Sequence, residues 1–287
     1  MTQSEEKELQ HITNLILKTA CIEKIICFGY IINTIRSKSC FTGESTYPTP
    51  EPLNSYYLLV IPCADEGILN SHLQQRIDSS CRDIALVTAI IHRMEEINEA
   101  LIHGSSFFIT IYKKGQLLYD RGKLEFEKPG AGASILNRIT KREKFWNKWS
   151  QLSVNLLKGA QFYTREGMNT LAVFMLHQSL QHCYSAMLRV LTGYRSNSNN
   201  LPRLIRLIEN ACLLPSVGLP RKTPQEARLS SLITKGFSDG RYNEKFEVSP
   251  EDADMLIKSV QDILNTAEEI CRLRIEKIRS GQLPYTF

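Results

Sequence analysis

Five helix-length segments follow one another in the second half of the chain, and they constrain its fold more than any other feature. Apolar residues recur at a spacing near 3.6 over residues 138–165, 168–191, 202–213, 224–240 and 250–279. The last segment has a well-formed start, because Ser249 stands at the N-cap position and Pro250 in the first turn. Short connections between long helices are typical of an antiparallel bundle, so the pattern predicts an all-α bundle over residues 136–287.

The first half of the chain alternates between helical and strand patterns. Helical spacing is found over residues 8–22, 67–81 and 93–104. Short apolar runs that predict buried strands cover residues 24–32, 55–62 and 84–92. Residues 37–54 contain three prolines and predict a loop, and residues 105–122 predict two strands that turn at Lys114 and Gly115. This order predicts a small domain with a mixed, mainly buried sheet.

The two patterns meet at LEFEKPGAGASI, residues 124–135, which contains Pro129, Gly130 and Gly132. A chain of 287 residues has room for two ordinary domains, each with its own core. We therefore predict an α+β protein with a mixed-sheet domain over residues 1–128 and a helical domain over residues 136–287.

Composition places the chain among ordinary globular proteins, with 43% hydrophobic and 23% charged residues. No apolar run approaches the roughly 18 to 20 residues needed to span a bilayer. The N-terminal MTQSEEKELQ has neither the basic nor the apolar region of a secretory signal. The sequence predicts a cytoplasmic protein with no membrane partner.

Net charge differs between the two halves. Residues 1–130 carry 13 Lys and Arg against 16 Asp and Glu, a net of −3, and residues 131–287 carry 22 against 14, a net of +8. An anionic partner is therefore expected to prefer the second half. A surplus of this size is common among helical domains and does not by itself indicate nucleic-acid binding.

Eight cysteines are scattered along the chain, at positions 21, 27, 40, 63, 81, 183, 212 and 271. None belongs to a C-x-x-C pair, and most lie inside apolar runs. Structural zinc sites have closely spaced ligand pairs, so this spacing predicts buried free thiols, no metal site and no cofactor.

Several segments of both halves resemble the prokaryotic fusion of a minimal nucleotidyltransferase domain with a HEPN helical domain. In the second half the resemblance rests on FWNKWSQLSVNLLKGAQFY, FMLHQSLQHCYSAMLRVLTGYRSNSNNL, FSDGRYNEKFEVSPEDADML and EEICRLRI. In the first half it rests on IICFGY, YYLLVIP and FFITIYKKGQLLYDRG. The resemblance covers nearly the whole chain and implies a nucleotidyltransferase-like fold followed by a HEPN-type bundle that dimerises.

The resemblance implies a nucleotide site in the first half, but its motif is altered. Active nucleotidyltransferases have Gly-Ser after the first strand and two magnesium-binding aspartates on the next strand. Here Gly29 matches the glycine, Tyr30 replaces the serine, and Ser55 and Tyr57 stand at the aspartate positions. Magnesium needs hard, charged oxygen ligands, so this departure predicts a degenerate, non-catalytic domain.

Two acids beyond the second strand, Asp65 and Glu66, are the available substitutes for the missing metal ligands. Their place in a loop favours solvated loop acids instead. A nucleotidyltransferase that recruits its metal in an unconventional way is kept as an alternative.

The HEPN resemblance assigns an arginine and a histidine to ribonuclease catalysis. Relatives often have Thr-His-Asn-Leu where this chain has Ser198-Asn199-Asn200-Leu201, so Arg195 matches the arginine and Asn199 replaces the histidine. An asparagine amide binds a phosphate or a base edge but cannot act as a general base. Arg195 and Asn199 are candidate catalytic residues in the rival reading, a metal-independent ribonuclease with another group as its base.

Basic residues gather around this loop, at Arg189, Arg195, Arg203 and Arg206. Two readings stay open for them, a groove that binds RNA at a dimer interface and a solvated basic face. With Asn199 and Asn200, we take Arg195, Arg203 and Arg206 as candidate binding residues.

The segment FSDGRY adds Asp239 and Arg241, next to Tyr242. They are candidates to line a phosphate site, although we favour a fold-stabilising network between helices. His177 and His182 lie five residues apart, a spacing that does not place two metal ligands on one helix face, and they are expected to be core or interface residues.

These observations predict a non-catalytic binding protein that forms a homodimer through its HEPN domain. RNA, a nucleotide, or a partner such as an antitoxin in a toxin–antitoxin or stress system is the expected ligand. The partners and this setting come only from the resemblance.

Overall fold

The computed structural model describes residues 3–32, 36–45, 53–131, 134–212, 218–219 and 223–282. The chain folds into two compact units. Unit 1 comprises Met1–Ala133, to which a short stretch beginning at Asn210 also clusters, and unit 2 comprises most of the chain from Ser134 onward. The predicted α+β class is confirmed, since a mixed-sheet region is followed by a helical region.

Unit 1 is built on a six-stranded mixed sheet. Its strands are β1 (Ile22–Ile32), β2 (Arg36–Ser39), β3 (Gly43–Ser45), β4 (Ser55–Pro62), β5 (Leu86–Ile91) and β6 (Gln116–Asp120). The strand order is β3-β2-β1-β4-β5, and β6 pairs with the first half of β1 while β2 pairs with its second half. Only the β4–β5 pair is parallel among these ladders.

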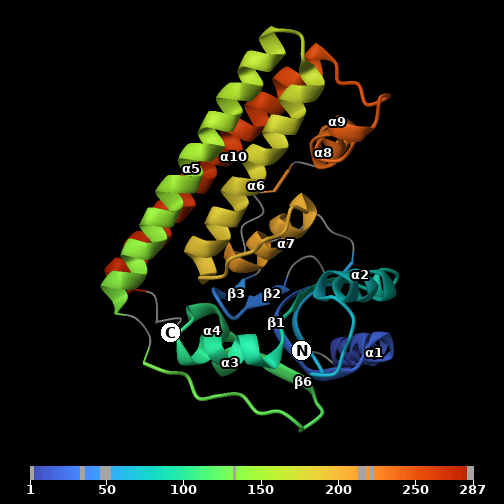
Figure 1. Ribbon diagram of the computed structural model, residues 1–287, viewed down its shortest axis with the longest axis vertical. Helices are drawn as coiled ribbons and strands as arrows, with labels where there is room; N and C mark the ends of the chain where they lie inside the picture. Colours follow the sequence, from blue (N-terminus) through green and yellow to red (C-terminus); the bar gives the residue numbers. More distant parts are fainter. Residues whose placement is uncertain are drawn as a thin grey trace. The chain divides into compact units, whose positions relative to one another are not determined.

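Four helices cover the two faces of this sheet (Figure 1). They are α1 (Gln3–Thr19), α2 (Asn70–Cys81), α3 (Met94–Ile102) and α4 (Ser106–Lys114). Apolar residues of α1 and α2, such as Ile12 and Ile77, pack in one core with alternate residues of β1, β4 and β5. Aromatic rings of Phe28, Tyr57 and Phe107 fill the other face. Burial on both faces explains why β1 and β4 are continuous apolar runs.

Two predictions for unit 1 are wrong. The run SFFITIYKK forms helix α4 and not a strand, because residues 106–111 are buried and pack against the aromatic face. A short apolar run has no period that separates a buried strand from a buried helix. Of the loop predicted over residues 37–54, residues 37–45 instead belong to the β2–β3 hairpin, in which Gly43 follows the turn with φ +92°. Residues 46–52 of that loop lie outside the described residues.

Unit 2 is a bundle of three long helices with shorter ones added. The helices are α5 (Ile135–Arg165), α6 (Asn169–Thr192), α7 (Leu201–Cys212), α8 (Pro224–Lys235), α9 (Asp239–Tyr242) and α10 (Pro250–Arg279). Figure 1 shows α5, α6 and α10 side by side. A turn at Gly167 makes α6 antiparallel to α5, and the Trp146–Glu268 and Glu143–Arg279 contacts make α10 antiparallel to α5.

Local signals in the sequence explain several helix ends in unit 2. The Ser249 hydroxyl accepts a hydrogen bond from the Asp252 amide at 3.1 Å, as predicted for the N-cap of α10. Gly193 ends α6 in the left-handed conformation, with φ +86°. The predicted helix over 224–240 is two helices, because the chain turns at Gly236, which lies directly against Val173 of α6.

No helix in the described parts of the chain is both long and apolar enough to cross a membrane.

Candidate functional site

The nucleotidyltransferase-like positions of unit 1 lie side by side in the sheet. Gly29 of β1 is paired with Tyr57 of β4, and Ile31 is paired with Ser55. Ser55 is 5% exposed and Tyr57 1% exposed, and the Tyr57 ring lies 6.2 Å from the Phe28 ring. The positions that the resemblance assigns to metal ligands are thus filled by a neutral side chain and a packed aromatic ring.

Asp65 and Glu66, the substitute acids, follow the last residue of β4, whereas Ser55 is its first residue. At ~3.3 Å per residue, the two ends of this strand are roughly 20 Å apart. The Glu66 carboxylate accepts hydrogen bonds from the amides of Ile68 and Cys21, both at 2.9 Å, and these bonds lower its pKa. Asp65 is exposed, as predicted. The prediction of a solvated acid is wrong for Glu66, because its carboxylate fixes the loop after β4 by two backbone hydrogen bonds.

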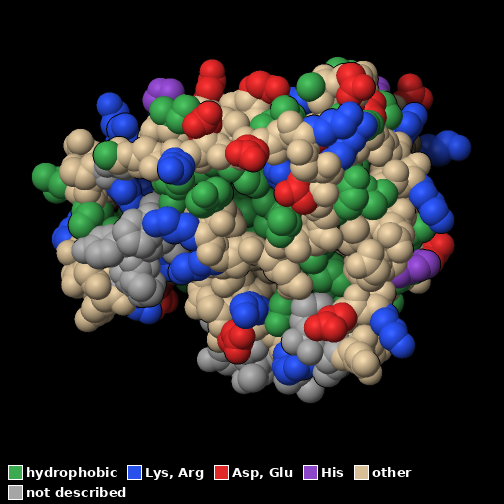
Figure 2. Space-filling view, turned by 90° about the horizontal axis from the view of Figure 1, so that it is seen from below, with side chains coloured by type: hydrophobic (Ala, Val, Ile, Leu, Met, Phe, Trp, Pro, Cys, Tyr) green, Lys and Arg blue, Asp and Glu red, His purple; other side chains and the backbone are tan. Residues whose placement is uncertain are grey.

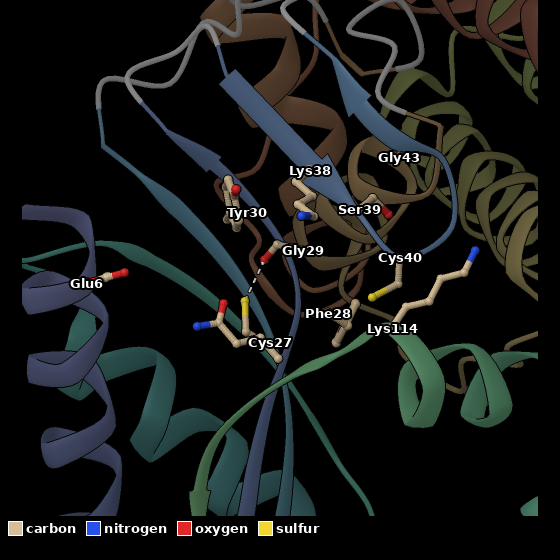
Figure 3. Close-up of a pocket in the computed structure, with 11 residues that line it drawn as sticks. Glu6, Cys27, Phe28, Gly29, Tyr30, Lys38, Ser39, Cys40, Gly43 and Lys114 are labelled. Atoms are coloured by element: carbon tan, nitrogen blue, oxygen red, sulfur yellow. Dashed lines mark hydrogen bonds between the residues drawn. The ribbon is translucent and has the colours of Figure 1, made fainter. Parts of the chain in front are cut away.

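A pocket of about 520 Å³ opens beside Gly29 and Tyr30 (Figure 3). Its other lining residues are Glu6, Cys27, Phe28, Lys38, Ser39, Cys40, Gly43, Lys114 and Gln116. The volume falls in the range of small-molecule sites, roughly 300–1,000 Å³. The pocket has two ammonium groups, from Lys38 and from the exposed Lys114. The Lys38 Nζ lies 3.2 Å from Glu44 Oε1. Such a pocket is suited to an anion held without a metal.

Three arginines from three helices meet at the end of the bundle where α6 stops. We call Arg142 of α5, Arg189 of α6 and Arg274 of α10 the arginine cluster. Arg142 is 7% exposed and Arg274 8% exposed. Nη2 of Arg274 donates to the Leu191 carbonyl at 3.0 Å, and Nη1 of Arg189 donates to the Gly193 carbonyl. Two of the three guanidinium groups thus hold the backbone that leads from α6 into the next loop.

Charge repulsion within the arginine cluster is visible in its pKa values. Burial, followed by repulsion from Arg274 and Arg189, lowers the pKa of Arg142 to about 10. Burial and the charge of Arg195 lower the pKa of Arg189. An anion bound here would offset part of this repulsion.

The loop over residues 193–200 carries the HEPN-type positions. Arg195 is exposed, and its charge acts on Arg189 at the end of α6. The Asn199 amide oxygen accepts a hydrogen bond from Gln181 Nε2 at 2.7 Å, which ties the loop to α6. The Asn200 side chain accepts from the Arg203 amide at 2.9 Å and so caps the N-terminus of α7. All three residues are exposed. Asn199 and Asn200 hold the loop in place by their hydrogen bonds, and Arg195 is the charged member of the three.

The other predicted basic residues are less accessible than their pattern suggested. Arg203 is 5% exposed, and Arg206 is half-buried on the same helix. The reading of a solvated basic face is therefore wrong for Arg203. On the face drawn in Figure 2, Lys and Arg side chains are interspersed with Asp and Glu side chains. Burial distinguishes the arginine cluster from such mixed surface charge.

Arg241 takes part in a separate aromatic stack. Its guanidinium carbon lies 4.0 Å from the centre of the Phe237 ring, and its Nε donates to the Phe237 carbonyl at 2.8 Å. On the same helix bundle, the centres of the Phe237 and His177 rings are 5.2 Å apart. Asp239 accepts a hydrogen bond from the Ser238 hydroxyl at 2.9 Å. His177 and Arg189 are 12 positions apart on α6, or about 18 Å. The predicted binding residues thus fall into two groups that do not share a site.

Both histidines of α6 are packed, as predicted. His177 is 1% exposed, and burial together with the charge of Arg241 lowers its pKa to about 4. The His182 ring stacks on Trp149 of α5 at 5.0 Å, and burial lowers its pKa. Neither imidazole stands where Asn199 replaces the histidine of the relatives.

Two members of the arginine cluster, Arg142 and Arg274, were missed by the analysis of the sequence. A signal was present, because Arg142 falls in phase with the buried Ile139 and Trp146, and Arg274 follows three residues after the buried Cys271. An arginine on the apolar stripe of a helix is unusual unless it has a partner or a ligand.

The helical unit matches a known family. Residues 147–270 match the HEPN domain family. The matched segment includes α6, the loop over residues 193–200 and most of α10, and HEPN domains commonly dimerise. Arg142 and Arg274 lie on α5 and α10 just outside the matched segment. The match contains none of residues 1–133, and no curated protein matches the chain.

Proposed function

We propose that the HEPN domain binds the phosphate backbone of RNA at the arginine cluster and Arg195, and that it does so without cleaving the RNA. The observation that carries this proposal is the meeting of Arg142, Arg189 and Arg274 beside the loop with the exposed Arg195. Guanidinium groups bind phosphate by paired, directional hydrogen bonds, and several in one place bind a polyanion.

The chemistry of Asn199 supports the part of the proposal that excludes cleavage. Its amide does not titrate, and its oxygen is engaged by Gln181. The nearby histidines of α6 are packed against aromatic rings. Phosphodiester cleavage by a neighbouring 2′-hydroxyl needs a group that removes the proton, and an asparagine amide cannot do so.

Unit 1 is part of the same proposal as a degenerate nucleotidyltransferase-like domain. The neutral Ser55 and the buried Tyr57 at the metal-ligand positions support this assignment. A cytoplasmic homodimer through the HEPN domain and an antitoxin-like protein partner complete the proposal, and these points rest on the resemblance and on the usual behaviour of HEPN domains.

The test is RNA binding by the full chain across a salt series. Arg195→Glu is expected to weaken binding about tenfold or more and to reduce the salt slope by about one. Arg165→Glu is the matched control, because it makes the same charge change on an exposed residue at the far end of α5. Equal affinities of the two variants would reject the proposed site.

The rival function is a metal-independent ribonuclease that uses Arg195. The exposed arginine beside a phosphate-binding cluster is the observation that favours it. Incubation of labelled RNA with wild type and Arg195→Ala in the presence of a chelator separates the two readings. We expect intact RNA in both, whereas cleavage by the wild type alone would establish the ribonuclease.

Unit 1 has a second candidate function, nucleotide binding without a metal. The pocket beside Gly29 with Lys38 and Lys114 supports it. Calorimetry with ATP in a chelator is expected to give weak binding that Lys114→Glu removes and that Lys128→Glu, an exposed control outside the pocket, retains. Binding that requires magnesium would instead favour the unconventional nucleotidyltransferase.

A further inference from the structure

Two cysteines distant in sequence face each other where β1 begins and β4 ends. The antiparallel register pairs Ile22 with Pro62, so Cys21 and Cys63 are the next opposed residues, and the Cys63 amide donates to the Cys21 carbonyl at 2.9 Å. Opposed residues of an antiparallel pair have Cα atoms about 4.5–5.5 Å apart. This separation lies within the range that a disulfide spans, roughly 4.4–6.8 Å.

The backbone around both cysteines is fixed by side chains. The Glu66 carboxylate accepts from the Cys21 amide at 2.9 Å, and Arg93 donates to the carbonyls of Cys63 at 2.9 Å and of Glu66 at 2.7 Å. The loop after β4 is therefore held against the first residue of β1. Both sulfurs, together with an Asp65 carboxylate oxygen, lie within 4.8 Å of one another.

A guanidinium group bridges the two sulfurs. Nη1 of Arg121 lies 2.9 Å from Cys21 Sγ and 2.7 Å from Cys63 Sγ, and the side chain of Arg121 is exposed. A cationic donor at this distance stabilises a thiolate, which is the reactive form of cysteine. Because Arg121 reaches the pair from solvent, it can leave when the sulfurs approach each other.

The two cysteines differ in access to solvent. Cys21 is half-buried, whereas Cys63 is 3% exposed. Burial, followed by a hydrogen bond shared with Cys21, raises the pKa of Cys63 to about 11, while Arg121 acts in the opposite direction. Cys63 thus retains its proton as long as Cys21 is a free thiol, which leaves Cys21 as the accessible nucleophile.

We propose that Cys21 and Cys63 are a reactive dithiol that small-molecule disulfides oxidise to an intramolecular disulfide, with Cys21 as the attacking and Cys63 as the resolving cysteine. This assignment is independent of the function proposed for unit 2. The Cys21 thiolate attacks one sulfur of a disulfide RS–SR and expels RS⁻, which leaves a mixed disulfide on Cys21. Cys63 then loses its proton to the solvent and attacks the Cys21 sulfur, which expels the second RS⁻.

The exchange is balanced, because two protein thiols are oxidised and one disulfide is reduced to two RSH. Burial continues to raise the pKa of Cys63 in the mixed disulfide, but the hydrogen bond with Cys21, which also raises it, is removed, and the opposing effect of Arg121 remains. The second step is therefore favoured once the first has occurred. The disulfide links the residue before β1 to the residue after β4, which are neighbouring strands of the sheet. It is expected to raise the Tm of unit 1.

A second pair of cysteines in unit 1 provides an internal contrast. Cys27 and Cys40 both line the pocket of Figure 3. Burial raises the pKa of Cys27 to about 12 and that of Cys40 to about 11. Cys27 donates from its thiol to the Gly29 carbonyl at 3.3 Å, so it is held as a neutral thiol. These two cysteines are expected to stay reduced while Cys21 and Cys63 react.

The alternative use of this cluster is metal binding by Cys21, Cys63 and Asp65. The Arg121 guanidinium argues against it, because a cation already lies between the two sulfurs and would repel a divalent ion. A closed structural zinc site also needs four ligands, and the cluster comprises three.

The experiment incubates the full chain with mixtures of oxidised and reduced glutathione at neutral pH, followed by acid quenching, alkylation and peptide mapping by mass spectrometry. Two of the eight thiols are expected to be lost first, in a disulfide that links the peptides of Cys21 and Cys63. Cys63→Ser is expected to stop at a glutathione adduct on Cys21, and Cys21→Ser to react about tenfold more slowly. Cys40→Ser, a half-buried cysteine of the same unit, is the matched control and is expected to react like the wild type.

Arg121→Ala is expected to slow the first step by about tenfold, because it removes the cationic donor 2.9 Å from Cys21 Sγ, with an unchanged circular dichroism spectrum. Wild-type protein that keeps all eight thiols, or that forms a different disulfide first, would overturn the proposal. Binding of one zinc ion per chain would also overturn the proposal if it is abolished by Cys21→Ser, by Cys63→Ser and by Asp65→Asn. That result would make the cluster a metal site.

Discussion

The positions that the resemblance assigns to catalysis lie in different surroundings in the two units. In unit 1, Ser55 and Tyr57 are buried, and the Tyr57 ring belongs to the aromatic packing of the sheet. In unit 2, Asn199 is exposed on a loop, and the charged groups around it are still present. Close packing fixes a buried replacement, whereas a loop position accepts change at little cost. The packing of unit 1 therefore depends on its replaced residue Tyr57, whereas the loop of unit 2 keeps its charged neighbours, as the proposed function requires.

The largest expected effect comes from Tyr57→Asp, which restores the carboxylate that the resemblance assigns to this position. A charge at a position that is 1% exposed is expected to cost about 3–5 kcal/mol and to unfold unit 1. Circular dichroism in a urea series measures the loss. Both tryptophans, Trp146 and Trp149, lie in α5, so tryptophan fluorescence reports on unit 2 alone and is expected to stay native.

Tyr57→Phe is the control for this substitution, because it keeps the ring in the aromatic packing. A folded Tyr57→Asp variant with wild-type stability would show that unit 1 tolerates the charge. It would contradict the claim that packing fixes the residue at this position in unit 1.

The next largest effect is a loss of stability of unit 2 in mild acid, caused by His177. Its folded pKa of about 4 lies below the ordinary 6.5, so the unfolded chain takes up the proton first. Its contribution is complete above pH 6.5 and declines as the pH falls toward 4, by at most about 3 kcal/mol. Denaturation followed by tryptophan fluorescence at several pH values measures this decline. His177→Gln is expected to flatten the profile, and an unchanged profile would assign the decline to other groups.

A smaller effect distinguishes helix ends that have a side-chain cap from those that do not. Ser249→Ala is expected to destabilise unit 2 by about 1 kcal/mol, because it removes the acceptor of the Asp252 amide. Ser105 stands at the same position of α4 in unit 1, but its side chain makes no capping hydrogen bond. Thermal unfolding of Ser105→Ala is therefore expected to match the wild type, and equal losses in both variants would contradict the assignment of the caps.

The smallest effect is expected from Asn199→His, since Asn199 is exposed and the surrounding loop is not part of a core. Stability is expected to change by no more than about 0.5 kcal/mol. RNA affinity is expected to fall slightly, because the hydrogen bond with Gln181 that positions the loop is altered. No cleavage of labelled RNA is expected under the proposed function, which is binding alone. Cleavage by this variant would show that the proton acceptor was the single missing group.

Much of the helical unit was predictable from local patterns. The predicted helix over 250–279 is α10 with the same bounds, and the Ser249 cap is confirmed. In unit 1 the strands of IICFGY and YYLLVIP were predicted correctly, whereas α4 was not. The run FFITIY has no period that distinguishes a buried strand from a buried helix, and its packing against Phe28 decided the outcome.

The candidate sites were less predictable than the elements that carry them. Arg195 and Asn199 were identified because they lie close together in the sequence, in a loop that resembles the catalytic loop of HEPN ribonucleases. Arg142 and Arg274 are 132 positions apart (274 − 142) and meet because α5 and α10 are antiparallel. Glu66 was predicted to be solvated. The sequence does not show the two hydrogen bonds of its carboxylate, because the Cys21 amide is distant in the chain and the Ile68 amide lies in irregular backbone.

The sequence by itself determined the helical bundle, the mixed sheet and the absence of carboxylates at residues 55 and 57, because these follow from periodicity and residue type. Only the tertiary structure decided that three arginines, of which Arg142 and Arg274 are buried, share one end of the bundle and that Arg121 bridges Cys21 and Cys63. The reason is physical: strand register and helix packing set the distances between residues far apart in the chain, and local patterns contain neither.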